Sequence, residues 1–62
     1  MRIEIPHPIT LKDLADKLGQ KPFRVVADAM ELGKMKFPGD AVEFEMATKI
    51  AKKYGYETAR QG

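Results

Sequence analysis

The residues of this chain most able to do chemistry are basic, and they fall into two clusters along the sequence. Exposed lysine and arginine side chains contact phosphates and release condensed counterions, so about four to six such contacts give a salt-sensitive affinity for nucleic acid. The sequence therefore predicts nucleic-acid binding at six residues: Lys17, Lys21 and Arg24 in the first cluster, and Lys49, Lys52 and Lys53 in the second.

Acidic and aromatic neighbours modify this prediction. Asp16, Asp28 and Glu31 lie near the first cluster and lower its positive potential. The 11 basic and 9 acidic residues leave a net charge of +2, which by itself does not indicate a nucleic-acid-binding protein. A solvated charged face is thus the alternative for both clusters. Phe44 and Tyr56 are candidates to stack on bases, with packing in the core as their alternative role.

The composition argues against catalysis. The chain has no serine or cysteine, so the usual nucleophiles of acyl transfer are missing. Its glycines are scattered singly and form no GxxxxGK[ST] phosphate-binding loop. The carboxylate pair Asp13 and Asp16 is typical of a solvated helix face, and the lone His7 is too little for a zinc site. We expect no cofactor, no metal and no enzymatic activity.

Short amphipathic elements must position the two clusters. Apolar residues recur with helical spacing in the first expected helix: Leu11, Leu14, Ala15 and Leu18. Thr10 is placed to cap this helix and Gly19 to end it, while Pro22 suits the first turn of the next helix. The sequence predicts an α+β domain of three short helices packed on a small sheet of two or three short strands. The expected helices lie near 11–18, 22–32 and 44–54, and the expected strands near 2–5, 34–37 and 56–58.

The apolar positions also predict which side of each element faces the core. The second helix carries one stripe of Phe23, Val26, Ala27 and Met30, widened by Val25, Ala29 and Leu32. Asp28 and Glu31 are then expected on its solvent side. The alternation in 34–37 places Met35 and Phe37 inward. Gly19 and Gly33, as helix-ending residues, are expected to adopt positive φ.

The size of the chain sets further limits. Sixty-two residues make one domain near the lower limit for a self-sufficient core. The absence of cysteine excludes disulfides and fits a cytoplasmic location, and the longest apolar run, Val25–Ala27, is too short to span a membrane. We expect a monomeric domain over 1–57, with 58–62 as the start of a linker or a frayed end, and the chain as a fragment or freed module of a longer protein.

Three segments together resemble a known family. ITLKDLADKLGQKP, MELGKM and VEFEMATKIAKKYGYE occur in the order and spacing found in the small N-terminal domain of bacterial translation initiation factor two. The resemblance covers roughly Ile3 to Glu57. The chain departs from the family pattern at Phe37-Pro38-Gly39-Asp40, where relatives have a polar turn containing Asn-Gln. It departs again in the third helix, which is acidic in the family and carries Lys49, Lys52 and Lys53 here.

The resemblance implies a non-catalytic accessory module of a GTPase whose nucleotide site lies in other domains. It also implies a fold similar to the stem-contact domain of some aminoacyl-tRNA synthetases, and hence a ribosome, ribosomal RNA or tRNA partner. The spacing of Ala15, Gly19 and Val25 leaves a DNA-binding helix-turn-helix as one alternative. Protein–protein docking through Met30, Met35 and Met46 is the other, and it would be nearly insensitive to salt.

Overall fold

The computed structural model describes residues 2–60, which form three helices and four short strands. In chain order these are β1 (Arg2–Ile5), β2 (Ile9–Thr10), α1 (Leu11–Leu18), α2 (Pro22–Glu31), β3 (Ala41–Val42), α3 (Phe44–Lys53) and β4 (Glu57–Arg60). β1 pairs with β4 in parallel, and β2 pairs with β3 antiparallel, as two separate sheets. The predicted α+β class is confirmed, and each predicted helix agrees with the structure to within one residue at its ends.

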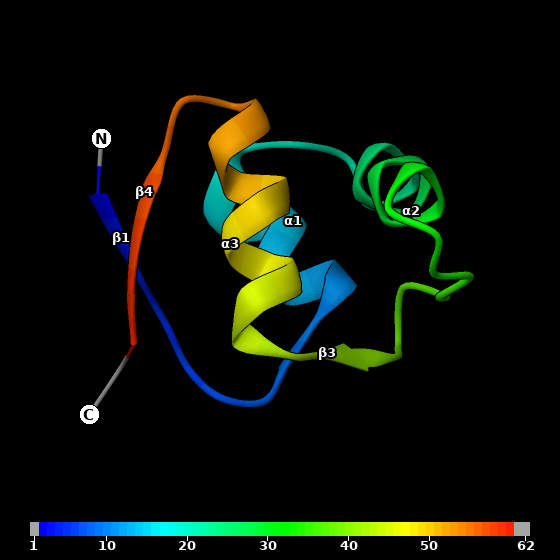
Figure 1. Cartoon of the computed structure of the whole chain (residues 1–62), viewed down its shortest axis with the longest axis horizontal. Coiled ribbons are helices and arrows are strands. Elements are labelled where there is room, and N and C mark those ends of the chain that lie inside the picture. Colours follow the sequence, from blue (N-terminus) through cyan, green and yellow to red (C-terminus); the bar gives the residue numbers. More distant parts are fainter. Residues whose placement is uncertain (1, 61–62) are drawn as a thin grey trace.

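The parallel β1–β4 pair joins the two ends of the described chain. Two parallel strands need a long connection between them. The connection between β1 and β4 contains all three helices. Figure 1 shows the two strands along one flank, with α3 beside them and α2 on the other side of α3. The elements enclose one core of fully or almost fully buried apolar residues: Ile5, Ile9, Leu11, Leu14, Ala15, Leu18, Val25, Ala29, Val42, Ala47, Ile50 and Ala51.

Helix α1 begins and ends through the signals that its sequence carries. The Thr10 hydroxyl accepts a hydrogen bond from the backbone N–H of Asp13 at 3.1 Å, as a helix cap does. Two further first-turn N–H groups donate to the turn at 37–40, Leu11 to the Asp40 carbonyl and Lys12 to the Pro38 carbonyl. The turn in which this chain departs from the family pattern therefore satisfies the N-terminus of α1.

Gly19 ends α1 in the left-handed conformation, with φ of 68°. Replacing it with alanine is expected to lower the free energy of unfolding by about 1–2 kcal/mol, because a Cβ disfavours positive φ. The added methyl meets no atom within 4 Å, so the loss is conformational and not steric. The measurement is chemical denaturation, with Gly39→Ala as the control. Gly39 has neither a positive φ nor a close neighbour, so an equal loss in the control would contradict this account.

The predicted buried face of α2 is right for Val25 and Ala29 and wrong for Phe23, Met30 and Asp28. The structure buries Val25, Asp28 and Ala29, and leaves Phe23 64% and Met30 55% exposed. The helix carries apolar residues on two opposite sides, so the hydrophobic pattern alone did not decide which side faces the core. The Asp28 carboxylate is turned toward the end of α3, where Lys53 and Tyr54 donate hydrogen bonds to it.

The predicted strand at 34–37 is also wrong, since no strand forms there and the sheet partner of β2 is β3 at 41–42. The backbone N–H groups at both ends of this segment form local hydrogen bonds instead of sheet hydrogen bonds. The N–H of Lys34 donates to the Ala29 carbonyl at 3.0 Å, and that of Phe37 to the Asp40 carboxylate at 2.8 Å. Met35 and Phe37, expected inward, are 76% and 67% exposed.

The C-terminal strand is longer than predicted and lies slightly later, at Glu57–Arg60 instead of 56–58. Residues 58–60, which the sequence analysis assigned to a linker or frayed end, pair with β1 in the register Ile3 with Thr58 and Ile5 with Arg60. The Thr58 hydroxyl also lies 2.7 Å from that of Thr48 on α3. These contacts join β4 to β1 and to α3. Residues 61–62 lie outside the described part of the chain.

Candidate nucleic-acid interface

Helix α3 brings two of the predicted basic residues to one exposed surface. Lys49 and Lys52 are three residues apart, so they project from the same side of the helix, and both are exposed. Together with Phe44, Glu45 and Thr48 they line a shallow depression of about 280 Å³. Within residues 2–60 neither lysine forms an ion pair, so both ammonium groups face solvent.

Arg60 extends this surface from β4. Its guanidinium lies over the Phe44 ring, 4.9 Å from the ring centroid, in a cation–π arrangement. Phe44 itself is half-buried. Its ring packs against the core, as the alternative role predicted, and is also partly exposed. We call Phe44, Lys49, Lys52 and Arg60 the α3 basic surface. Sequence reasoning missed Arg60 because residues 58–62 were expected to be a linker or frayed end, whereas Arg60 belongs to β4 and pairs with Ile5 of β1.

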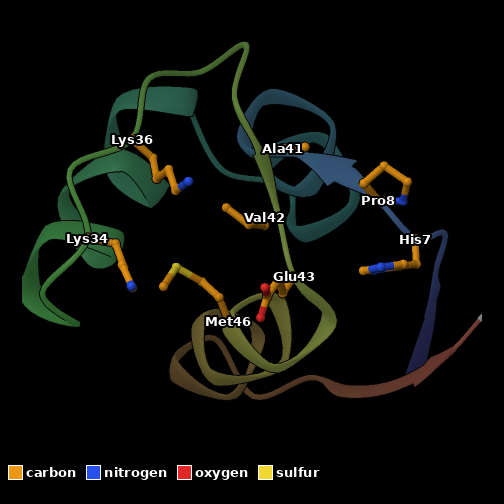
Figure 2. Close-up of a pocket in the computed structure, with 8 residues that line it drawn as sticks. All are labelled: His7, Pro8, Lys34, Lys36, Ala41, Val42, Glu43 and Met46. Carbon is orange, nitrogen blue, oxygen red and sulfur yellow. The ribbon is translucent and has the colours of Figure 1, made fainter.

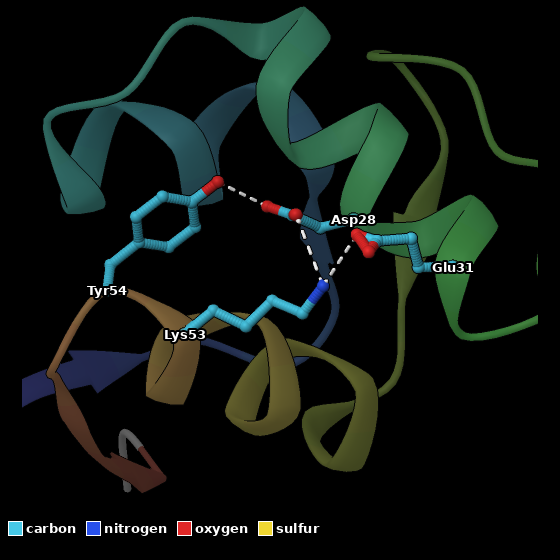
Figure 3. A network of polar contacts seen from close by, with 4 residues as sticks. All are labelled: Asp28, Glu31, Lys53 and Tyr54. Carbon is cyan, nitrogen blue, oxygen red and sulfur yellow. Dashed lines mark hydrogen bonds and ion pairs between the residues drawn. The ribbon is translucent and has the colours of Figure 1, made fainter.

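Lys53 does not join the other two lysines of its predicted cluster. Its ammonium group lies 2.8 Å from a Glu31 carboxylate oxygen and 3.4 Å from an Asp28 carboxylate oxygen, both on α2. Figure 3 shows Lys53 and Tyr54 reaching from the end of α3 to these two acids. The hydrogen bond to Glu31 is the main reason why the pKa of Lys53 is raised above 10.5. Lys53 therefore ties α3 to α2.

The Tyr54 hydroxyl completes this network by donating a hydrogen bond to the other Asp28 oxygen. Burial is the main cause of its pKa rising above 10.0, and the bond to Asp28 adds to the rise. The nearby Arg24 guanidinium acts in the opposite direction. Lys53 offsets one of the two negative charges of Asp28 and Glu31, and the other still lowers the positive potential of the first basic cluster.

The first cluster surrounds the connection between α1 and α2. Lys17 lies in the last turn of α1, Lys21 is the N-cap residue of α2, and Arg24 follows in its first turn. All three are exposed. Figure 1 shows this connection and the C-terminal end of α3 toward the same edge of the molecule. The influence of Arg24 on Tyr54 agrees with that placement.

A second and larger hollow, of about 400 Å³, lies between the segment after α2 and β3. Figure 2 shows Lys34 and Lys36 at one side of it, His7 and Pro8 at the other, and Met46 and Val42 between them. Its full lining is His7, Pro8, Lys34, Lys36, Ala41, Val42, Glu43 and Met46. No serine, threonine or cysteine lines this hollow, so it holds no hydroxyl or thiol nucleophile.

Within residues 2–60, no helix is long and apolar enough to cross a membrane. Over the same residues, no group of three or more histidine, cysteine or acidic side chains is arranged to hold a metal ion.

Comparison with known proteins identifies the family. The model for the family described as "Translation initiation factor IF-2, N-terminal region" matches residues 6–57. This chain belongs to that family. The resemblance found in the sequence is thereby confirmed, and the domain is the N-terminal region of a translation initiation factor.

Individual IF-2 proteins agree with this result. The chain is 33% identical over 58 residues to translation initiation factor IF-2 of Brucella anthropi, and 31% identical over 58 residues to those of Brucella ovis and Brucella abortus. These matches cover 94% of this chain but only 6% of each relative. The chain thus spans a small fraction of the IF-2 proteins that it matches.

Proposed function

We propose that this IF-2 N-terminal region is a non-catalytic accessory module, monomeric and cytoplasmic, that makes a weak, salt-sensitive contact with structured RNA of the ribosome. Ribosomal RNA is the favoured partner and tRNA the other candidate. Membership of a translation initiation factor family supports the setting. The observation that carries the RNA contact is the α3 basic surface, which places Lys49, Lys52 and Arg60 around an aromatic ring.

This surface combines the two features by which proteins hold RNA. Lysine and arginine side chains neutralise phosphates, while aromatic rings and planar guanidinium groups stack on unpaired bases. Arg60 already lies over Phe44, so a base stacked on the outer side of the guanidinium would extend an existing stack. Lys17, Lys21 and Arg24 add further phosphate contacts for an RNA that reaches the α1–α2 connection.

The helix-turn-helix alternative is less well supported. In that arrangement α2 would enter the major groove of DNA with its exposed side. That side presents Phe23 and Met30, which offer no hydrogen bonds to base edges. The remaining alternative, docking of a protein, concerns a different surface, on the exposed side of α2.

We expect the double variant Lys49→Gln/Lys52→Gln to bind a fluorescent RNA stem-loop on the order of tenfold more weakly at low salt. Its plot of log affinity against log salt should be shallower by about 1–2 units, because two phosphate contacts are lost. Fluorescence anisotropy over a salt series measures both quantities.

The control is Lys34→Gln/Lys36→Gln, which changes the net charge equally but on the other hollow. It should keep most of the affinity and the salt slope. Equal losses in the two double variants would mean that only the net charge matters. An affinity for the stem-loop that does not change with salt would contradict phosphate contacts by these lysines and would favour the alternative, an apolar contact with a protein.

A further inference from the structure

Helix α2 carries a second apolar face that the domain itself does not cover. Phe23, Ala27 and Met30 recur at i, i+4 and i+7 on the side opposite the buried Val25 and Ala29. All three are exposed, Phe23 and Met30 by more than half. A helix that is apolar on opposite sides is typical of an element buried on both. We call these three residues the α2 outer face.

The charges around the α2 outer face are predominantly positive. The acidic residues of α2, Asp28 and Glu31, are ion-paired with Lys53 of α3. Lys21 and Arg24 flank the Phe23 end of the stripe, and Lys34 follows the Met30 end. Within residues 2–60 none of these three cations forms an ion pair. Lys53 offsets one of the two negative charges of Asp28 and Glu31, and the three cations outweigh the other. The stripe is therefore apolar with a net positive border.

We propose that the α2 outer face docks an acidic amphipathic helix of a partner protein. The stripe extends about 10 Å along α2, or two helical turns, which suits packing against the apolar ridge of another helix. Acidic residues beside that ridge complement Lys21, Arg24 and Lys34. The flexible Met30 side chain adapts to the shape of the incoming helix.

Other occupants fit this surface less well. RNA phosphates would satisfy the cations but leave Phe23 and Met30 in water. A second copy of the chain, related by a two-fold axis, would place the same cations opposite one another and repel. A basic helix would meet the same repulsion. The acidic helix is the occupant that satisfies both the apolar stripe and its charged border.

The test is an NMR titration of the isotope-labelled chain with a synthetic helical peptide. The peptide carries leucine at i, i+3, i+4 and i+7 and glutamate at most other positions. A matched peptide has the same leucines and lysine for glutamate. The acidic peptide should shift the amide signals of residues 21–34, and the basic peptide should bind at least about tenfold more weakly.

Variants separate the α2 outer face from general charge attraction. Phe23→Gln and Met30→Gln should each weaken binding of the acidic peptide by about tenfold or more while leaving the fold intact, since both side chains are exposed. Lys49→Gln/Lys52→Gln, on the α3 basic surface, should leave it unchanged. The two surfaces are thus tested independently, and failure of either proposal does not affect the other.

Several results would overturn the proposal. One is shifts confined to the hollow beside Lys34 and Lys36; another is equal binding of the two peptides. A third is signals of the α2 outer face that move with protein concentration in the absence of peptide, which would assign the face to a second copy of the chain.

Discussion

Replacing Ile50 with alanine is expected to leave the domain largely unfolded at 25 °C. Ile50 is fully buried at the centre of α3, and removing its branched side chain opens a cavity that costs about 2–5 kcal/mol. A core in a domain of this size supplies only about 3–5 kcal/mol of net stability. Circular dichroism against temperature and denaturant measures the loss.

The conservative change Ile50→Val is the control for this prediction. It removes one methylene from the same place and should lower the free energy of unfolding by only about 0.5–1.5 kcal/mol, leaving a folded domain. A fully folded Ile50→Ala variant with a loss below about 1 kcal/mol would contradict the position of α3 in the core.

The second large effect is expected from Tyr54→Phe, which deletes one hydroxyl group. Tyr54 donates to the buried carboxylate of Asp28, and hydrogen bonds to charged groups contribute about 1.5–3 kcal/mol. The variant leaves that carboxylate with Lys53 as its remaining side-chain partner, at 3.4 Å. Each kilocalorie lost lowers the melting temperature by about 4–8 °C in a domain of this size. Thermal unfolding at neutral pH measures the change.

The pH dependence of the same variant gives an independent check. Burial and Asp28 raise the pKa of Tyr54 above 10.0, so the folded protein holds this proton more tightly than the unfolded chain. The resulting stability is fully present below pH 10 and is lost as the pH rises through the raised pKa. Stability of the wild type should therefore fall more steeply above pH 10 than that of Tyr54→Phe.

Tyr56→Phe is the matched control for both measurements. The Tyr56 ring also packs against the core, but within residues 2–60 its hydroxyl has no hydrogen-bond partner. The control should change stability by less than about 0.5 kcal/mol and keep the alkaline slope of the wild type. Equal effects of the two substitutions would show that the bond between Tyr54 and Asp28 contributes nothing.

The parts of the fold that the sequence predicted well are those governed by local signals. The stripe of α1 and its two caps lie within ten residues of one another, and the structure has them as predicted: Leu11, Leu14, Ala15 and Leu18 are all buried. Gly19 and Gly33 both adopt the expected positive φ. Spacing and caps sufficed because a helix end is decided by the residues next to it.

The parts that failed depend on partners far away in the sequence. Asp28 was expected in solvent because its partners, Lys53 and Tyr54, lie 25 and 26 residues later. Phe23 and Met30 were accordingly expected in the core, whereas the structure exposes both. Arg60 was missed because the strand that holds it pairs with β1 at the other end of the chain, a distant partner that the local pattern does not indicate.

In the candidate site, too, local spacing was predicted well and distant contacts were not. Lys49 and Lys52 share a surface because their spacing on one helix ensures it, as the sequence predicted. Lys53, one residue further, turns to α2 and leaves the cluster. Within a helix, spacing predicts which residues share a face; it does not predict which of them another helix will engage.

The most direct test of an RNA contact through the α3 basic surface is an NMR titration of the labelled chain with structured RNA and, separately, duplex DNA, each at low and moderate salt. We expect the amide signals of four residues to shift: Phe44, Lys49, Lys52 and Arg60. Smaller shifts are expected from Lys17 to Arg24. These shifts should be stronger for RNA than for DNA and should fade as salt is added. No shift with RNA, or shifts confined to the exposed side of α2, would contradict an RNA contact through the α3 basic surface.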